Sequence, residues 1–151
     1  MRKNKNIVNQ MKISFPSLSV NESTARAVVA AFVAQADPTV SELADIKCAV
    51  SEAVTNSVFH GYPDTIGDIY ISVQIFEGRL LRIEIKDKGK GIEDVQKAIE
   101  PLFTTAPESE RSGLGFTVMQ SFTDKMNVRS KPEKGTSVVL FKQLRSKNQA
   151  E

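Results

Sequence analysis

The chain has 151 residues, a length that suits one compact domain, and its 20 basic and 18 acidic side chains give a formal net charge of +2. It has no Trp, two Tyr and no basic stripe with interleaved aromatic residues, which argues against nucleic-acid binding. Its longest apolar run is too short to span a bilayer and its start is polar and basic, so we expect a cytoplasmic protein.

The first elements expected are a strand and a helix. Apolar and polar residues alternate over residues 11–15, which is typical of a half-buried strand that ends near Pro16. We expect Asn21 to cap the following helix and Arg26 to lie on its outer face. The apolar stripe of this helix is formed by Ala25, Val28, Val29, Phe32 and Val33.

A second helix is predicted after the break at residues 37–38. Thr39 and Glu42 have the spacing of a capping box, and the apolar pattern continues until Gly61. The lone Cys48 has no internal disulfide partner, and we expect it to be a buried packing residue. His60 is expected to be a structural residue at the end of the helix.

The rest of the chain predicts a hairpin, two short helices and two closing strands. Residues 77–79 carry a tight hairpin signal. The expected strands are 69–76, 80–86, 126–130 and 136–141, and the expected helices are 95–99 and 115–122. This mixture indicates an α+β fold with a mostly antiparallel sheet and helices on one face. We expect one domain over residues 9–143, with flexible tails at 1–8 and 144–151.

Glu52 and Asn56 stand one helical turn apart in an otherwise apolar segment. Residues four apart share a helix face, so both side chains should point the same way. An amide oxygen such as that of Asn56 suits Mg²⁺, which takes few protein ligands and fills its octahedron with water and phosphate oxygens. Glu52 could accept the proton of an attacking hydroxyl. The plainer interpretation of Glu52 is a surface carboxylate.

Two glycine-containing loops follow this helix in the sequence. Asp87 ends an apolar strand, where its carboxylate could accept a hydrogen bond from the exocyclic amine of adenine, and Gly89 and Gly91 would let backbone approach the base. Gly113 and Gly115 lead into a helix whose first N–H groups could bind phosphate, with Arg111 and Ser112 beside them. Each glycine pair alone is also compatible with a plain turn.

Together these motifs resemble the GHKL ATPase superfamily, in which an N-box helix, a DxGxG loop, a GxG loop and a GT strand hold ATP. The resemblance covers residues 11–141 and implies a Bergerat-type two-layer sandwich with a mostly antiparallel, mixed sheet. Residues 101–105, Pro-Leu-Phe-Thr-Thr, and residues 110–116, Glu-Arg-Ser-Gly-Leu-Gly-Phe, narrow the resemblance to the anti-sigma F factors of sporulation.

The resemblance implies a homodimer that holds sigma F and, with Mg²⁺ and ATP, phosphorylates a serine of an anti-anti-sigma partner, leaving ADP. It makes Glu52 the general base, Asn56 the magnesium ligand and Asp87 the adenine reader. Arg26 matches the position with which the family contacts both protein partners. The other implied nucleotide-binding residues are Gly89, Gly91, Thr104, Thr105, Arg111, Ser112, Gly113, Gly115 and Thr136.

The chain departs from the family pattern at four positions. Lys88 and Lys90 replace acidic and apolar residues in the glycine loop, Ala106 stands where a lysine is usual, and Leu114 replaces methionine. We expect the missing lysine to weaken phosphate binding and the loop lysines to alter partner choice. Two alternatives stay open: an ATP-gated sigma-binding module without turnover, and an anti-sigma kinase for a general stress sigma factor.

Overall fold

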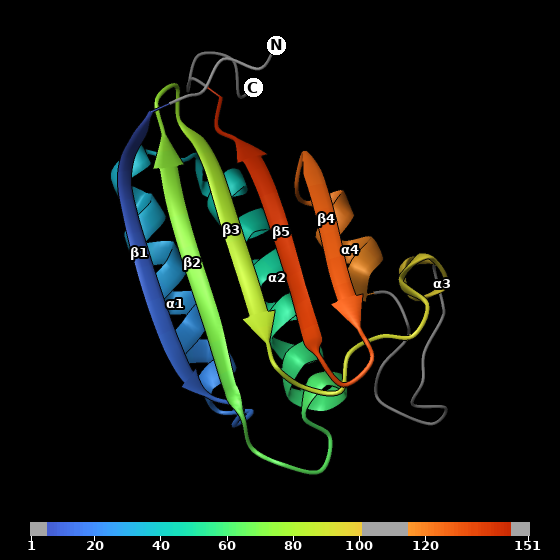
Figure 1. Ribbon diagram of the computed structural model, residues 1–151. Helices are drawn as coiled ribbons and strands as arrows, with labels where there is room; N and C mark the ends of the chain where they lie inside the picture. The colour runs from blue at the N-terminus through green and yellow to red at the C-terminus, as the bar shows by residue number, and fades with distance from the viewer. Residues whose placement is uncertain (1–5, 101–114, 146–151) are drawn as a thin grey trace.

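A five-stranded antiparallel sheet forms one layer of the molecule, and the helices cover one of its faces (Figure 1). This computed structural model describes residues 6–100 and 115–145. The strand order is β1-β2-β3-β5-β4. The strands are β1 (Ile7–Pro16), β2 (Asp68–Phe76), β3 (Leu80–Asp87), β4 (Lys125–Lys131) and β5 (Gly135–Gln143). The helices are α1 (Asn21–Val33), α2 (Val40–Asn56), α3 (Val95–Ile99) and α4 (Gly115–Ser121), with a 3-10 turn η1 (Ala34–Ala36) and a π-helical turn η2 (Ser57–Gly61).

The predicted α+β class is confirmed, and each of the four described strand pairings is antiparallel. The expected strands and helices are all present, with ends that differ by a few residues. β1 already pairs at Ile7, two positions before the expected domain boundary, and Leu144, just beyond the other boundary, is buried. No helix among the described residues is long and apolar enough to cross a membrane.

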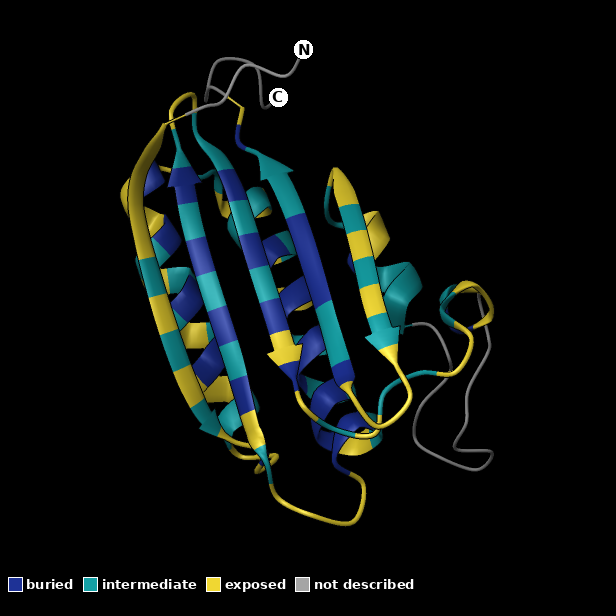
Figure 2. Ribbon diagram, in the orientation of Figure 1, coloured by how far each residue is buried: buried dark blue, intermediate teal, exposed yellow. Residues whose placement is uncertain are grey.

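Strand alternation sets which side chains enter the core between the sheet and the helices. In β2 and β3, every second residue is buried, as the banding in Figure 2 shows. Asp87 follows Leu81, Ile83 and Ile85 in the same phase of β3, so its side chain enters the same layer and is only 3% exposed. The strand period therefore buries one carboxylate at the end of an apolar row.

The two long helices begin differently. The predicted capping box of α2 is confirmed: the Thr39 hydroxyl accepts from the Glu42 N–H at 3.0 Å, and the Glu42 carboxylate accepts from the Thr39 N–H at 2.9 Å. The expected cap of α1 by Asn21 is wrong. Val20 occupies the cap position with helical backbone angles, and the Asn21 amide instead donates to the Pro16 carbonyl at 3.0 Å.

The last turn of the α2 segment is a π-helical turn, where the apolar pattern predicted ordinary helix. The Tyr62 N–H donates to the Ser57 carbonyl, five residues back, at 3.0 Å. His60 lies in this turn, at the end of the helix, as expected. The prediction that Cys48 is buried is wrong: α2 buries Ile46, Ala49 and Val50, and Cys48 lies off that stripe and is exposed.

Candidate active site

Glu52 and Asn56 face the first residue of α4. Both side chains are half-buried on one side of α2. A Cβ atom added at Gly115 would lie 3.2 Å from the Asn56 amide nitrogen and 3.3 Å from the Glu52 carboxylate. The structure thus confirms the shared helix face and brings an acid, an amide and a glycine backbone together from segments about sixty residues apart in sequence.

The Asp87 carboxylate is held by three hydrogen bonds. Oδ2 accepts from the Ser57 hydroxyl at 2.8 Å, and Oδ1 accepts from the backbone N–H groups of Gly89 at 3.0 Å and Thr136 at 3.3 Å. Two carboxylate oxygens offer about four lone-pair positions, so one acceptor position remains for a ligand. The group is therefore fixed in orientation and can still accept a hydrogen bond.

The π-helical turn η2 packs directly on the glycine loop after β3. The Lys90 N–H donates to the Gly61 carbonyl at 2.8 Å, and a Cβ atom at Gly89 would overlap that carbonyl group. A Cβ atom at Gly61 would come within 3.0 Å of the Asp87 carboxyl carbon. Gly89 is thus required by the close approach of two backbones, whereas a side chain at Gly61 would press on the buried carboxylate.

The same loop packs on the turn between β4 and β5. Gly91 has a φ of +75°, and a Cβ atom there would overlap the Lys131 carbonyl oxygen. Gly91 was expected to let backbone approach a base, and the direction of its missing Cβ faces protein backbone instead. Thr136 pairs with Asp87 across the β3–β5 ladder, and its hydroxyl lies 2.8 Å from the Ser130 hydroxyl. The Ser130 hydroxyl also accepts from the Ile92 N–H at 2.7 Å, which ties β4 to the loop.

The Tyr62 hydroxyl links the start of β2 to the start of the glycine loop. It donates to the Asp68 carbonyl at 2.8 Å and accepts from the Lys88 N–H at 2.7 Å. Burial is the main cause that raises the pKa of Tyr62 above its ordinary value, and the nearby Asp87 charge adds to it. The hydroxyl therefore stays protonated and serves as a donor and an acceptor at neutral pH.

The site also contains Ser57, Tyr62 and Ser130, which were not predicted as site residues from the sequence. The i, i+4 pattern selected Asn56, and the hydroxyl next to it in sequence carried no periodic signal that pointed to Asp87. The one available signal was the burial expected for Asp87 at the end of an apolar strand, because a buried carboxylate needs hydrogen-bond donors such as a serine hydroxyl. Ser57 is the first residue of the π-helical turn, and its hydroxyl supplies such a donor to Asp87.

Arg26 lies on α1 and is half-buried, not fully exposed. Its guanidinium lies 3.4 Å from the Glu22 carboxylate, one helical turn earlier, and donates to the Ser51 hydroxyl at 3.5 Å. Ser51 directly precedes Glu52 on α2. Arg26 therefore contacts α2 at the residue next to Glu52.

Part of the predicted site lies outside the described residues. This holds for Thr104, Thr105, Arg111, Ser112 and Gly113, and for the departures Ala106 and Leu114. The other two departures are described and exposed: Lys88 places its ammonium 5.2 Å from the centre of the Tyr70 ring, and Lys90 lies one residue beyond Gly89.

The oxygen atoms that face Gly115 suit a hard cation. Mg²⁺ prefers oxygen ligands and usually takes only one or two from protein when phosphate supplies others. Asn56 offers an amide oxygen at this place, so its chemistry fits one Mg²⁺ held together with phosphate groups, and this fit does not require the Glu52 carboxylate beside it. Within residues 6–100 and 115–145, no cluster of three or more His, Cys, Asp or Glu side chains could hold a metal by itself.

Residues 15–142 match the family described as the histidine kinase-like ATPase domain. An anti-sigma F factor from Anoxybacillus flavithermus is 57% identical over 137 residues, which cover 90% of this chain and 93% of that protein. An anti-sigma F factor from Bacillus licheniformis is 52% identical over 143 residues, which cover 94% of this chain and 97% of that protein.

A similar fold occurs in the crystal structure of the RsbU and RsbW domains of a protein from Mycobacterium tuberculosis. The superposition has a TM-score of 0.68 at 20% sequence identity, and it covers 92% of this chain and 34% of that one. A histidine kinase domain from Erythrobacter litoralis superposes with a TM-score of 0.54 at 19% identity and covers 82% of this chain and 61% of that one. At these identities the likeness concerns the fold alone.

Proposed function

Because this chain belongs to the histidine kinase-like ATPase domain family and, within it, to the anti-sigma F factors, we propose that it binds and inhibits sigma F. Using Mg-ATP, it also phosphorylates a serine of an anti-anti-sigma protein. The observation that carries the kinase half is the placement of Glu52 and Asn56 against Gly115, with the buried Asp87 fixed nearby through Ser57.

Asp87 recognises the adenine base in this proposal. Three donors already orient its carboxylate, so it accepts from the exocyclic amine with little reorganisation. A ligand that presents an acceptor at the same place would face a buried negative charge, which has a high energetic cost. The site therefore selects adenine over bases with a carbonyl group at that position.

Asn56 and the start of α4 hold the phosphate end. When bound, Mg²⁺ neutralises phosphate charge and thereby lowers the repulsion that an attacking oxygen meets. The amide oxygen of Asn56 supplies one ligand, and the absent side chain of Gly115 leaves room beside it. The predicted phosphate contacts of Thr104, Thr105, Arg111, Ser112 and Gly113 remain part of the proposal.

Glu52 acts as the general base in the transfer. It takes the proton from the serine hydroxyl of the partner as that oxygen bonds to the γ-phosphorus. The bond between the γ-phosphorus and the β–γ bridging oxygen breaks, and ADP leaves with the electron pair. The proton remains on the Glu52 carboxylate until it passes to solvent. Base catalysis of this kind typically contributes about 10²–10⁴-fold to the rate.

Phosphate transfer from labelled Mg-ATP to a sporulation anti-anti-sigma protein tests the kinase half. We expect Glu52→Gln to reduce transfer by at least about 10²-fold with ATP affinity retained, because a base acts on the proton. Asn56→Ala should lose Mg-ATP binding itself. The matched control is Glu77→Gln, at the exposed β2–β3 hairpin, which should behave as wild type.

The outcomes of this assay separate the open alternatives. If the wild-type protein binds ATP, the bound ATP is recovered unhydrolysed and the partner stays unlabelled, the chain is an ATP-gated binding module. If Glu52→Gln transfers phosphate at the wild-type rate, Glu52 is not the base. Binding to a panel of purified sigma factors, with a general stress sigma factor included, tests the choice of sigma F.

Arg26 is the proposed contact with the protein partners. We expect Arg26→Ala to weaken binding of sigma F while the protein still binds Mg-ATP, since Arg26 lies on α1 and pairs with Glu22 and Ser51. A homodimer and a cytoplasmic location complete the proposal. Light scattering with and without sigma F and ATP measures the mass of the assembly.

A further inference from the structure

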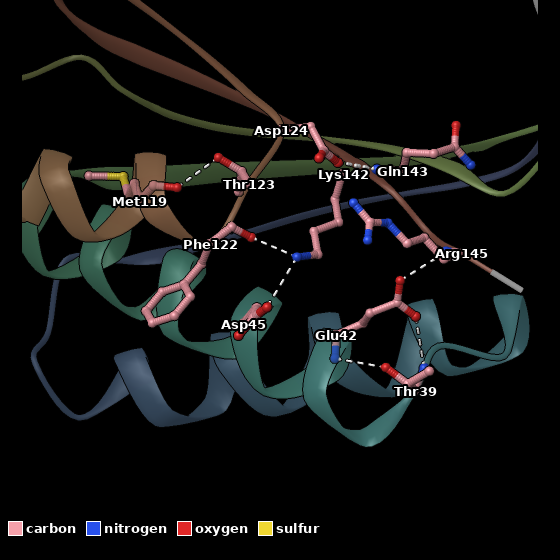
Figure 3. A network of polar contacts seen from close by, with 10 residues as sticks. All are labelled: Thr39, Glu42, Asp45, Met119, Phe122, Thr123, Asp124, Lys142, Gln143 and Arg145. Atoms are coloured by element: carbon pink, nitrogen blue, oxygen red, sulfur yellow. Dashed lines mark hydrogen bonds and ion pairs between the residues drawn. The ribbon is translucent and has the colours of Figure 1, made fainter. Parts of the chain in front are cut away.

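Lys142 of β5 reaches from the sheet into the helical layer and joins two helices (Figure 3). Its ammonium lies 3.2 Å from the Asp45 carboxylate on α2 and donates to the Phe122 carbonyl, just past the end of α4, at 2.9 Å. The Lys142 side chain is only 14% exposed. Burying this much of a lysine has an energetic cost, which the ion pair and the hydrogen bond offset.

The segment after α4 is fastened to the same part of β5. The Asp124 N–H donates to the Phe141 carbonyl at 2.9 Å, and the Asp124 carboxylate accepts from the Gln143 N–H at 2.6 Å. The Thr123 hydroxyl donates to the Met119 carbonyl at 2.7 Å and satisfies one carbonyl of the last helical turn. The Lys142 ammonium supplies the positive charge that favours a helix C-terminus.

The two ends of α4 meet two different parts of α2. Gly115 faces Glu52 and Asn56, whereas Phe122 is linked through Lys142 to Asp45, so the two helices run in opposite directions. Seven residue steps separate Gly115 from Phe122, and seven separate Asp45 from Glu52. At about 1.5 Å per residue, both spans are about 10 Å. An anchor at the Phe122 end therefore fixes where Gly115 lies along α2.

We propose that Lys142 is a positioning residue for the nucleotide site, acting through α4. It holds the C-terminal end of α4 to Asp45, which keeps Gly115 in place against Asn56 and Glu52 at the other end. The hydrogen bond of Lys142 to Phe122 lies at the opposite end of α4 from Glu52 and Asn56. This inference rests on the proposed function in one respect, namely that the Asn56 end binds Mg-ATP.

The test compares Mg-ATP dissociation constants of Lys142→Met, Lys142→Arg and Asp45→Asn with that of the wild-type protein. A misplacement of about 1 Å in an active site can lower the catalytic rate by up to about 10²-fold, and we expect the smaller effect of about tenfold weaker Mg-ATP binding in Lys142→Met. Lys142→Arg, which retains a charged donor, should stay close to wild type. Asp45→Asn leaves the hydrogen bond from Lys142 to the Phe122 carbonyl in place, so it should weaken Mg-ATP binding less than Lys142→Met does.

Two controls separate positioning from general loss of stability. Val29→Ala removes core volume on α1 and lowers stability away from α4, so at a temperature where the protein stays folded it should bind Mg-ATP as wild type does. Lys12→Met removes an exposed lysine from β1, at the opposite edge of the sheet from β4, and should change nothing. Hydrogen exchange of the α4 amides in nucleotide-free protein should rise in Lys142→Met and not in Val29→Ala.

The outcomes distinguish the inference from the function on which it rests. If the wild-type protein binds Mg-ATP and Lys142→Met binds it equally well with unchanged α4 exchange, the inference is overturned and the proposed function stands. The same holds if Val29→Ala weakens binding as much as Lys142→Met. If the wild-type protein binds no Mg-ATP, the proposed function fails, and the inference fails with it. Should Lys142→Met not fold, Asp45→Asn decides: weaker Mg-ATP binding with faster α4 exchange supports the inference, and wild-type values of both overturn it.

Discussion

The Ser57 hydroxyl donates a 2.8 Å hydrogen bond to the buried carboxylate of Asp87, thirty residues later in the sequence. This bond joins the π-helical turn after α2 to the end of β3. It also links the two halves of the site, because Ser57 is the immediate neighbour of Asn56. In the proposed function, the adenine end and the phosphate end are therefore coupled through one short stretch of backbone.

Removal of this hydroxyl should weaken both the fold and nucleotide binding. Ser57→Ala leaves a buried carboxylate oxygen without its donor, and an unsatisfied buried group costs about 1–3 kcal/mol of unfolding free energy. Urea unfolding measures that loss, and ATP titration measures the loss of affinity. Ser121→Ala, which removes an exposed hydroxyl bonded to Thr117, is the matched control and should change neither quantity. A Ser57→Ala protein as stable as the control would contradict the prediction.

Asp87 should determine the preference between nucleotides. ATP presents an amine at the position where ITP presents a carbonyl, so the wild-type carboxylate should bind ATP more tightly. Hydrogen bonds to charged groups contribute about 1.5–3 kcal/mol, which corresponds to a preference of about 10–150-fold. Asp87→Asn offers a donor and should shrink this ratio. Competition titrations of both nucleotides measure it, with Asp68→Asn as control. An unchanged ratio in Asp87→Asn would assign the base contact elsewhere.

Alanine substitutions at Gly89 and Gly115 should affect different properties, the first the stability of the fold and the second the binding of Mg-ATP. In Gly89→Ala the new methyl group overlaps the Gly61 carbonyl, so we expect a loss of about 1–3 kcal/mol in unfolding free energy. In Gly115→Ala the nearest described atoms to the methyl group are the movable ends of Asn56 and Glu52, at 3.2–3.3 Å. That protein should stay as stable as wild type and bind Mg-ATP more weakly. Unfolding curves and ATP titration give the two readouts, and the reverse pattern would refute the assignment.

The capping box of α2 should make stability depend on pH in the acidic range. Burial raises the pKa of Glu42, but hydrogen bonds from Thr39 and the Arg145 N–H, together with the Lys142 charge, outweigh burial and leave the pKa lowered. A lowered pKa in the folded state stabilises the protein above the unfolded pKa of about 4.3, and this contribution is lost as the pH falls through the folded value.

Glu42→Gln tests this dependence. The difference in urea midpoint between wild type and Glu42→Gln should be largest near about pH 7 and should shrink towards about pH 3. Glu77→Gln, at the exposed hairpin, should show no such trend. A difference that stays constant over this range would mean that the Glu42 charge does not contribute.

Local periodicity accounts for what could be predicted from the sequence. The alternation of apolar and polar residues over 69–76 and 80–86 indicated strands, because a strand buries every second side chain. The capping box at Thr39 and the shared face of Glu52 and Asn56 followed from spacing within one helix. The interpretations that failed, a cap by Asn21 and a buried Cys48, depended on which competing local contact or helix face prevails.

The sequence by itself determined the element order, the α+β class and which acid and amide share a helix face, because these depend on residues within a few positions of each other. The tertiary structure decided that Ser57 orients Asp87, that Gly61 and Gly89 meet, and that Lys142 anchors α4. Those contacts join residues 20 to 97 positions apart. No local pattern encodes them, because they form only when the sheet and the helical layer pack together and buried polar groups take the partners within reach.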